Sequence, residues 1–369
     1  MARYLVNDIE GKDPRSLLTT AVMANMMQNG IRTHVNEFIK YTGTRQLTIE
    51  AGVVLAVGDS IFKTEQTPLT LAHLDTGTQF IKGKDYYIYI CDQGSNDKNE
   101  VYKISLNSTY PNGFNANNSR KIGGFHYGDS RKINPVNLNP QNATGADWGS
   151  GWETQVSEDI LRFSVWCLTH RSAGAQDGMT YIPALNSWVS IYMLSQGTDG
   201  RLISKYNETP VSGSEGYCAF DAMEMLRSSQ MRPLTFQEFV VAAEGSPNGQ
   251  DNNTYAWTSS GNTNRTKTGQ IAYATSIYGC KDCVGLLWEA GANTIFRNDW
   301  LEPITSAPAG PKQSGFDIYQ YLPFSFGVHG GGMKEATACS SRAFYADVNP
   351  WVPSSEVGFR GICDHRTAA

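Results

Sequence analysis

Short runs of strand-forming residues separated by turn residues constrain the fold of this chain more than any other feature. Residues 85–91 alternate aromatic and aliphatic side chains, and the shorter runs 101–104 and 162–167 behave similarly. A period of two places successive side chains on opposite faces of a strand. With 36 Gly and 15 Pro supplying turns, the sequence predicts a strand-rich α+β fold that includes a small β-sandwich.

Helical periodicity is confined to three segments. The first begins after the capping pair Asp13-Pro14 and ends at Asn29-Gly30, with Met and Leu on its apolar stripe. The second covers about residues 219–228. The third begins at Thr235, where Glu238 completes a capping box. The sequence therefore predicts few helices among many strands.

These patterns divide the chain into three parts. Residues 1–41 are expected to form an N-terminal helical segment for attachment or trimerisation. Residues 42–157 are expected to form the β-sandwich domain and a linker, because residues 128–157 are dense in Asn, Gly and Pro. Residues 158–369 are expected to form a second domain, in which two helices precede short strands and displayed loops.

Charge and hydropathy exclude several functional classes. A formal charge of -5 gives no electrostatic footprint for nucleic acid. No apolar run approaches the ~20 residues that span a bilayer, so we expect no membrane insertion. The N-terminus lacks a charged segment followed by an apolar one, so we expect no Sec-dependent export.

The residue types that usually carry catalysis or metal binding form no motif here. The seven cysteines are odd in number and scattered, which argues against a disulfide framework. Cys280 and Cys283 form one CxxC pair, but a structural zinc site needs a second pair nearby and none follows. We therefore predict no metal site, no cofactor and no catalytic residues.

The C-terminal segment from Gly330 to His365 is the most informative part of the sequence. A frame of small, apolar and arginine residues alternates in it with segments of mixed chemistry that follow neither a helical nor a strand period. Such a pattern is typical of a binding surface displayed on an ordered scaffold. The plainer alternative is an ordinary C-terminal loop and closing strand.

The frame resembles the variable region of retroelement-diversified proteins, a family with a C-type-lectin-like fold that includes the tropism determinants of phage tail fibres. Its GG…SRA…P…GFR elements are Gly330-Gly331, Ser341-Arg342-Ala343, Pro350 and Gly358-Phe359-Arg360. The resemblance covers residues 42–369. It also rests on residues 85–92, 119–127, 177–180, 204–207, 236–239 and 358–365.

The resemblance implies a non-enzymatic protein of a virion, located at the tail-fibre tip and made in the host cytoplasm. Its C-terminal C-type-lectin-like domain, residues 158–369, would bind a host-cell surface receptor, either a protein or a glycan. Homotrimers and contacts with tail or baseplate proteins are implied as well. The variable, receptor-binding positions would be Gly332, Lys334, Ala336, Ala338, Tyr345, Asp347, Val348, Val352, Ser354 and Glu356.

The chemistry of the segment refines this expectation. Tyr345 and Asp347 have the spacing that places side chains on one face of a strand. Trp351, an aromatic type common at binding hot spots, is added to the receptor-binding set; alternatively its indole is buried and donates to a carbonyl. The expected scaffold residues are Arg342, Phe344, Phe359 and Arg360.

Two other functions remain open on the same fold. A formylglycine-generating type of enzyme needs a pair of reactive thiols with a depressed pKa, for which Cys339 and Cys363 are the candidates. A calcium-dependent lectin needs clustered oxygen ligands, for which the candidates are Asn298-Asp299-Trp300 and Glu302-Pro303.

Overall fold

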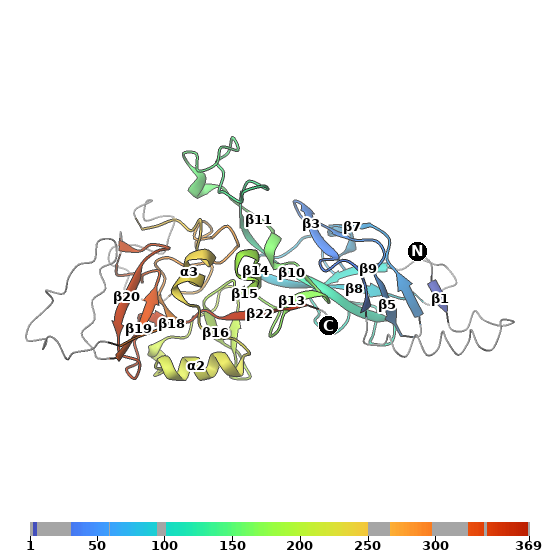
Figure 1. The fold of residues 1–369 in the computed structure, drawn as a ribbon. Coiled ribbons are helices and arrows are strands. Elements are labelled where there is room, and N and C mark those ends of the chain that lie inside the picture. The colour runs from blue at the N-terminus through green and yellow to red at the C-terminus, as the bar shows by residue number, and fades with distance from the viewer. Residues whose placement is uncertain are drawn as a thin grey trace, which may run out of the picture. The chain divides into compact units, whose positions relative to one another are not determined.

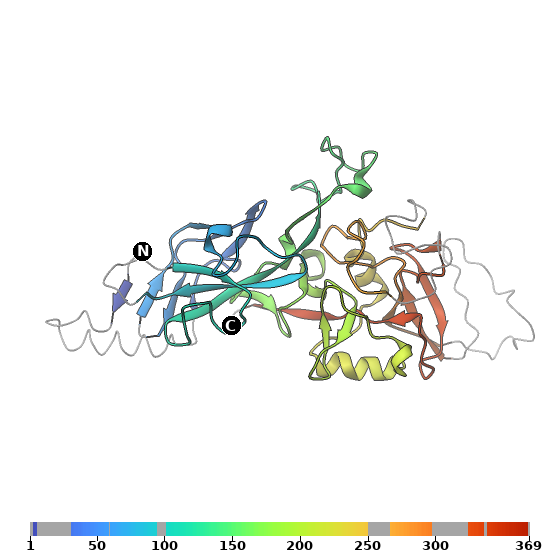
Figure 2. The same ribbon diagram turned by 180° about the vertical axis from the view of Figure 1, so that it is seen from behind.

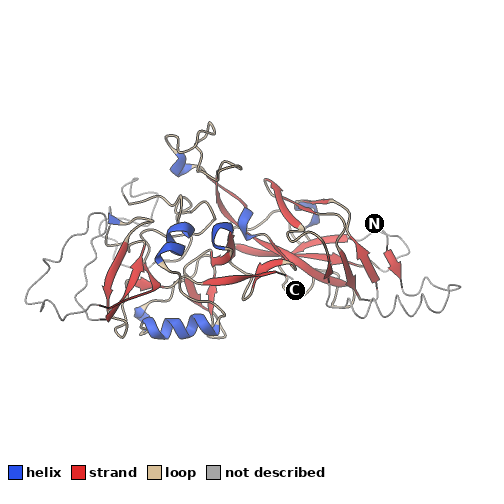
Figure 3. Cartoon of the chain, in the orientation of Figure 1, coloured by secondary structure: helices blue, strands red, loops and turns tan. Residues whose placement is uncertain are grey.

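The computed structural model is rich in strands and has few helices, as predicted (Figure 3). The chain divides into two compact units. Unit 1 comprises residues 1–128, 159–171 and 366–369, and unit 2 comprises residues 129–158 and 172–365. The residues that the structure describes are 3–5, 31–58, 60–93, 101–249, 266–296, 324–335 and 338–367. The predicted helix over residues 14–29 lies outside them.

Most strands are short, and they occur in both halves of the chain (Figures 1 and 2). In the first half they are β1 (Arg3–Leu5), β2 (Ile31–Arg32), β3 (Ile39–Gly43), β4 (Gln46–Ile49), β5 (Val54–Val57), β6 (Ser60–Lys63), β7 (Thr67–Leu69), β8 (Lys84–Cys91), β9 (Val101–Ser105), β10 (Ser119–Arg131), β11 (Val156–Ile160), β12 (Trp166–Cys167), β13 (His170–Ser172) and β14 (Met179–Ile182). In the second half they are β15 (Ser187–Ser190), β16 (Leu194–Gln196), β17 (Leu202–Ser204), β18 (Trp288–Phe296), β19 (Phe324–His329), β20 (Phe344–Val348), β21 (Val357–Gly358) and β22 (Ile362–Thr367).

Two of the predicted α-helices lie in unit 2, α2 (Ala219–Ser228) and α3 (Phe236–Ala242). The capping box that places the start of α3 is present, because the Thr235 hydroxyl accepts from the Glu238 amide and the Glu238 carboxylate accepts from the Thr235 amide. The described residues also form 3-10 turns at Leu71–His73, Trp152–Thr154, Arg162–Ser164, Pro183–Leu185 and Gly213–Glu215.

Unit 1 buries its apolar side chains between antiparallel strands. β1 and β2 pair with β6 and β5, β4 lies between β3 and β7, and β8 lies between β9 and β10. The alternating run of β8 contributes Tyr86, Ile88 and Ile90 to the core. A side chain on Gly124 of β10 would lie 2.5 Å from the Tyr86 carbonyl oxygen, so the close approach of these strands requires glycine.

Unit 2 contains the four-stranded sheet that carries the C-terminal frame. Its order is β20-β19-β18-β21, antiparallel except for the parallel pair β18–β21. The frame glycines Gly330 and Gly331 follow β19, each with φ of 86°. A Cβ on Gly330 would lie 2.2 Å from the Cys283 carbonyl oxygen, so neither the conformation nor the space permits a side chain there.

Residues 128–157, which are dense in Asn, Gly and Pro and predicted to form a long loop or linker, are largely irregular. Hydrogen bonds within the segment nevertheless hold it together. Asp147 accepts hydrogen bonds from the side-chain amides of four residues, Asn134, Asn137, Asn139 and Gln141. These donors lower the pKa of Asp147. Side-chain amides therefore supply the order that a strand or helix would otherwise provide.

His329 at the end of β19 is buried, and among the described residues neither of its ring nitrogens has a hydrogen-bond partner. It is 1% exposed and lies among the rings of Phe236, Phe239 and Phe344, with centroids 5.1 to 5.6 Å away. Burial lowers the pKa of His329 to about 3. The folded protein therefore holds this imidazole neutral.

We expect His329 to make folding stability fall on acidification. Between about pH 6.5 and pH 3 the unfolded chain binds a proton here that the folded chain does not, so unfolding is favoured by up to about 1.4 kcal/mol per pH unit. Replacing His329 by Leu should remove this slope in urea unfolding measured between pH 6 and pH 4. His34→Leu, at an exposed position, should retain it. Parallel pH profiles for His329→Leu and the parent would contradict the assignment.

Candidate binding pocket

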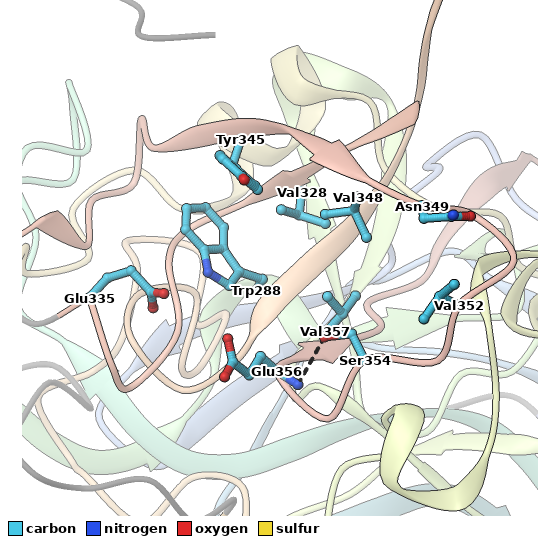
Figure 4. A pocket seen from close by; sticks show the side chains of 10 residues that line it. All are labelled: Trp288, Val328, Glu335, Tyr345, Val348, Asn349, Val352, Ser354, Glu356 and Val357. Atoms are coloured by element: carbon cyan, nitrogen blue, oxygen red, sulfur yellow. Dashed lines mark hydrogen bonds between the residues drawn. The ribbon is translucent and has the colours of Figure 1, made fainter. Parts of the chain in front are cut away.

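A pocket of about 490 Å³ lies at the sheet β20-β19-β18-β21 of unit 2 (Figure 4). Its residues come from the four strands of this sheet, from the turn after Gly332 and from the loop between β20 and β21. They are Trp288, Val328, Glu335, Tyr345, Val348, Asn349, Val352, Ser354, Glu356 and Val357. We call this the C-terminal pocket.

Two aromatic rings form one wall of the C-terminal pocket. Trp288 begins β18 and Tyr345 lies in β20, with ring centroids 5.9 Å apart and planes at 38° (Figure 4). Both side chains are only half-buried. The Trp288 amide donates to the Glu356 carbonyl oxygen at 2.9 Å, which fixes the start of β18 beside the loop.

Tyr345 and Val348 both line the pocket although they are three residues apart. Val328 pairs with Tyr345 and Phe326 with Val348, so β20 contains one residue more than β19 between these pairs. Such a bulge resets the alternation of side chains along a strand. The simple two-residue spacing used for the sequence prediction therefore does not describe this strand.

The loop after β20 is held by its own polar groups. The Asn349 side-chain oxygen accepts from the Trp351 amide at 3.0 Å, and the Ser354 hydroxyl accepts from the Glu356 amide at 3.3 Å (dashed in Figure 4). The Ser354 carbonyl oxygen accepts from the Gly213 amide at 2.9 Å. A Cβ on Gly213 would lie 2.1 Å from the Ser354 nitrogen, so the loop rests directly on backbone.

Two carboxylates lie next to the aromatic wall. Glu335 and Glu356 lie on the side of Trp288 away from Tyr345 (Figure 4). A Glu335 carboxylate oxygen accepts from the Gly332 amide at 2.8 Å. Glu356 accepts a hydrogen bond from the Lys334 ammonium. The pocket thus combines aromatic rings, apolar branched side chains and carboxylates.

The predicted receptor-binding residues are only partly brought together. Five line the C-terminal pocket, namely Tyr345, Val348, Val352, Ser354 and Glu356, and Lys334 is bound to the last of these. Gly332 is buried, whereas Ala338 is exposed. Asp347 lies in β20, and Ala336 lies outside the described residues.

Trp351 is 63% exposed, so the alternative of a buried indole does not hold. Its ring centroid lies 5.3 Å from that of Phe220 in α2. Trp351 therefore belongs to an exposed aromatic pair, and it is not among the residues that line the C-terminal pocket.

Sequence reasoning missed Trp288, Val328, Glu335, Asn349 and Val357. Glu335, Asn349 and Val357 each adjoin a predicted position and could have been found by extending the set by one residue. Trp288 reaches the pocket through the pairing of β18 with β21, a strand distant in the chain, and Val328 through the pairing of β19 with β20. The sequence contains no local signal for that pairing.

Arg360 has the geometry of a scaffold residue. It is 1% exposed, and its guanidinium donates to both Glu289 carboxylate oxygens at 2.7 to 2.9 Å. It also donates to the carbonyl oxygens of Ser190, Ile191 and Lys281. All five donors of the guanidinium fork are thus directed at oxygen atoms within unit 2.

The other three predicted scaffold residues differ in how deeply their side chains are buried. Phe359 is buried, and Phe344 is half-buried with its ring stacked on His329 at 5.6 Å. Arg342 is instead exposed, and within the described residues its guanidinium has no hydrogen-bond partner. The prediction of a scaffold role is wrong for Arg342, because the turn before β20 directs its side chain to the surface beside Phe236 and Val240.

The two candidate thiols lack the properties of reactive cysteines. Cys339 donates to the Gly332 carbonyl oxygen and Cys363 to the Gln230 carbonyl oxygen, each at 3.0 Å. Burial raises the pKa of Cys339 to about 12 and also raises the pKa of Cys363. A nucleophilic thiol requires the opposite shift.

The described residues contain no group of three or more His, Cys, Asp or Glu side chains that could hold a metal ion. Cys280 and Cys283 are both buried. The calcium-ligand candidates at residues 298–303 lie outside the described residues. In the part of the chain that is described, no helix is both long and apolar enough to span a bilayer.

Comparison with known proteins identifies the first part of the chain. Residues 37–153 match the family model of the Mtd second domain. This part of the chain is similar to the Mtd second domain. Over 353 residues it is 27% identical to the tail fiber receptor-binding protein of Bordetella phage BPP-1, covering 88% of this chain and 81% of the relative. The predicted resemblance is therefore confirmed well beyond the Mtd second domain.

Solved structures extend the likeness to the fold. The Major Tropism Determinant P3c and M1 variants each match with a TM-score of 0.69, at 23% and 22% identity. In both cases the match covers 94% of this chain and 88% of the other. Together with the Mtd second domain, this confirms the predicted strand-rich fold with a C-type-lectin-like C-terminal part.

Proposed function

We propose that this protein is a phage tail-fibre receptor-binding protein that determines host tropism, and that the C-terminal pocket contacts the host receptor. The observation that carries this proposal is the convergence of five predicted contact residues on one pocket. The relative from Bordetella phage BPP-1 is itself a tail fiber receptor-binding protein. Pockets with aromatic walls and a few polar groups are typical binding sites.

In unit 2 the residues that hold the frame are buried, whereas several of the proposed contact residues are exposed. The frame depends on buried groups, above all the Arg360–Glu289 pair and the glycines after β19. Lys334, Val352 and Glu356 instead end in partly exposed side chains. Replacing such residues leaves the buried contacts intact. This arrangement suits diversification, which a near-repeat of the coding sequence beside a reverse-transcriptase gene would demonstrate.

The protein acts in this proposal by binding, without catalysis. A formylglycine-generating mechanism needs reactive thiols, and burial raises the pKa of both Cys339 and Cys363. We therefore assign no catalytic residue and no cofactor to the chain.

The proposed partners are a host-cell surface receptor and the proteins of the phage tail or baseplate, at the tail-fibre tip of the virion. We also propose a homotrimer, in which residues 1–41 contribute to attachment or assembly. Three linked copies raise the effective concentration of each binding site and compensate for weak single contacts. Light scattering of the full chain should give the mass of three copies; a monomer at micromolar concentration would contradict this.

The experiment that tests the proposed function is host-cell adsorption by virions carrying Tyr345→Ala. Tyr110 provides a matched control, because it is an exposed tyrosine of unit 1, outside the C-terminal pocket. Loss of adsorption with Tyr345→Ala, and normal adsorption with Tyr110→Ala, would support a receptor site at this pocket.

A further inference from the structure

The C-terminal pocket carries the chemistry of a cation site, which deepens and rests on the proposed function. Its aromatic wall presents Trp288 and Tyr345, the two ring types whose faces attract cations most strongly. Carboxylates of Glu335 and Glu356 lie beside Trp288 (Figure 4). Aromatic faces next to carboxylates attract a cation through both ring quadrupole and charge.

The chain already pairs one cation with a carboxylate that lines the pocket. The Lys334 ammonium donates to the Glu356 carboxylate, and the two side chains are 50% and 41% exposed. Ion pairs with this exposure contribute little to stability, because water and salt screen them and both side chains lose freedom. Lys334 can therefore leave Glu356 at small cost when another cation arrives.

The hydrogen-bonding capacity of the pocket favours a donor-rich ligand. Carboxylates accept hydrogen bonds and do not donate them when ionised. A Glu335 oxygen is engaged by the Gly332 amide, and a carboxylate has further acceptor positions. Lysine ammonium and arginine guanidinium groups carry only donors, and their alkyl stems can pack on Val348 and Val352.

We infer that the C-terminal pocket binds a lysine or arginine side chain of a host surface protein, and that Lys334 is the internal cation which this side chain displaces. The incoming cation lies against Trp288 and pairs with Glu335 and Glu356. Lys334 then acts as a competitor that lowers affinity for weakly matched ligands.

The test uses the full chain and three small probes in ligand-observed NMR titrations. N-acetyl-lysine methylamide and N-acetyl-arginine methylamide should bind at least about tenfold more tightly than the neutral N-acetyl-norleucine methylamide. The double variant Glu335→Gln/Glu356→Gln should remove this difference. Lys334→Ala should strengthen binding of the lysine probe severalfold, because it removes the internal competitor.

The Lys205–Glu208 pair of unit 2 is a matched control. Its ammonium and carboxylate are 2.7 Å apart, and the side chains are 51% and 39% exposed, as in the Lys334 pair. Lys205→Ala and Glu208→Gln should leave probe binding unchanged. Equal affinity for the lysine and norleucine probes, or no effect of the double variant, would overturn the cation assignment.

Host-cell adsorption separates this inference from the proposed function. If Tyr345→Ala abolishes adsorption while Glu335→Gln/Glu356→Gln leaves it intact, the pocket is the receptor site and the ligand is not a cation. Pocket-dependent binding of a neutral methyl glycoside would likewise overturn the inference in favour of a glycan. If neither variant affects adsorption, the proposed function itself fails.

Discussion

Replacing Arg360 by alanine is expected to destabilise unit 2 by about 3–5 kcal/mol, because it leaves the Glu289 carboxylate buried without its counter-charge. Three backbone carbonyls, of Ser190, Ile191 and Lys281, would lose donors as well. Natural domains are stable by only about 5–15 kcal/mol. The melting temperature should therefore fall by about 10 °C or more for a unit of this size.

Two variants show whether the buried pair causes this loss. Arg201 is an exposed arginine paired with Asp199, and Arg201→Ala should change stability by no more than about 0.5 kcal/mol. The double variant Arg360→Met/Glu289→Leu removes both charges and should recover part of the stability lost in Arg360→Ala. An unchanged melting temperature for Arg360→Ala would show that this contact does not hold the frame.

Replacing Trp288 or Tyr345 by alanine is expected to weaken receptor binding by about 2 kcal/mol or more, which corresponds to about 30-fold in Kd. The two rings form one wall at 5.9 Å, so each substitution also removes support from the other ring. The double variant should therefore lose less than the sum of the single losses. Strict additivity would show that the rings act independently and would contradict a shared wall.

The sequence predicted much of the local structure because those signals are local. The alternation in residues 85–91 corresponds to β8, and the capping box at Thr235 marks the start of α3. Glycines of the frame were recognised from the resemblance, and their positive φ gives the physical reason for them.

The composition of the pocket could be predicted only in part because it depends on long-range pairing. Trp288 enters through the parallel contact of β18 with β21, and the bulge in β20 decides which residues face the pocket. Neither feature has a local sequence pattern. Long-range pairing also explains why Arg342 is exposed and Arg360 is buried. Of the two, only Arg360 meets a buried carboxylate, that of Glu289 in β18.

The most direct test of a receptor site at the C-terminal pocket is a binding isotherm of the labelled full chain on host cells. Tyr345→Ala should raise Kd about 30-fold while its melting temperature stays near that of the parent. Tyr110→Ala, the exposed control in unit 1, should leave Kd within about twofold. Unchanged binding by well-folded Tyr345→Ala would contradict a receptor site at this pocket.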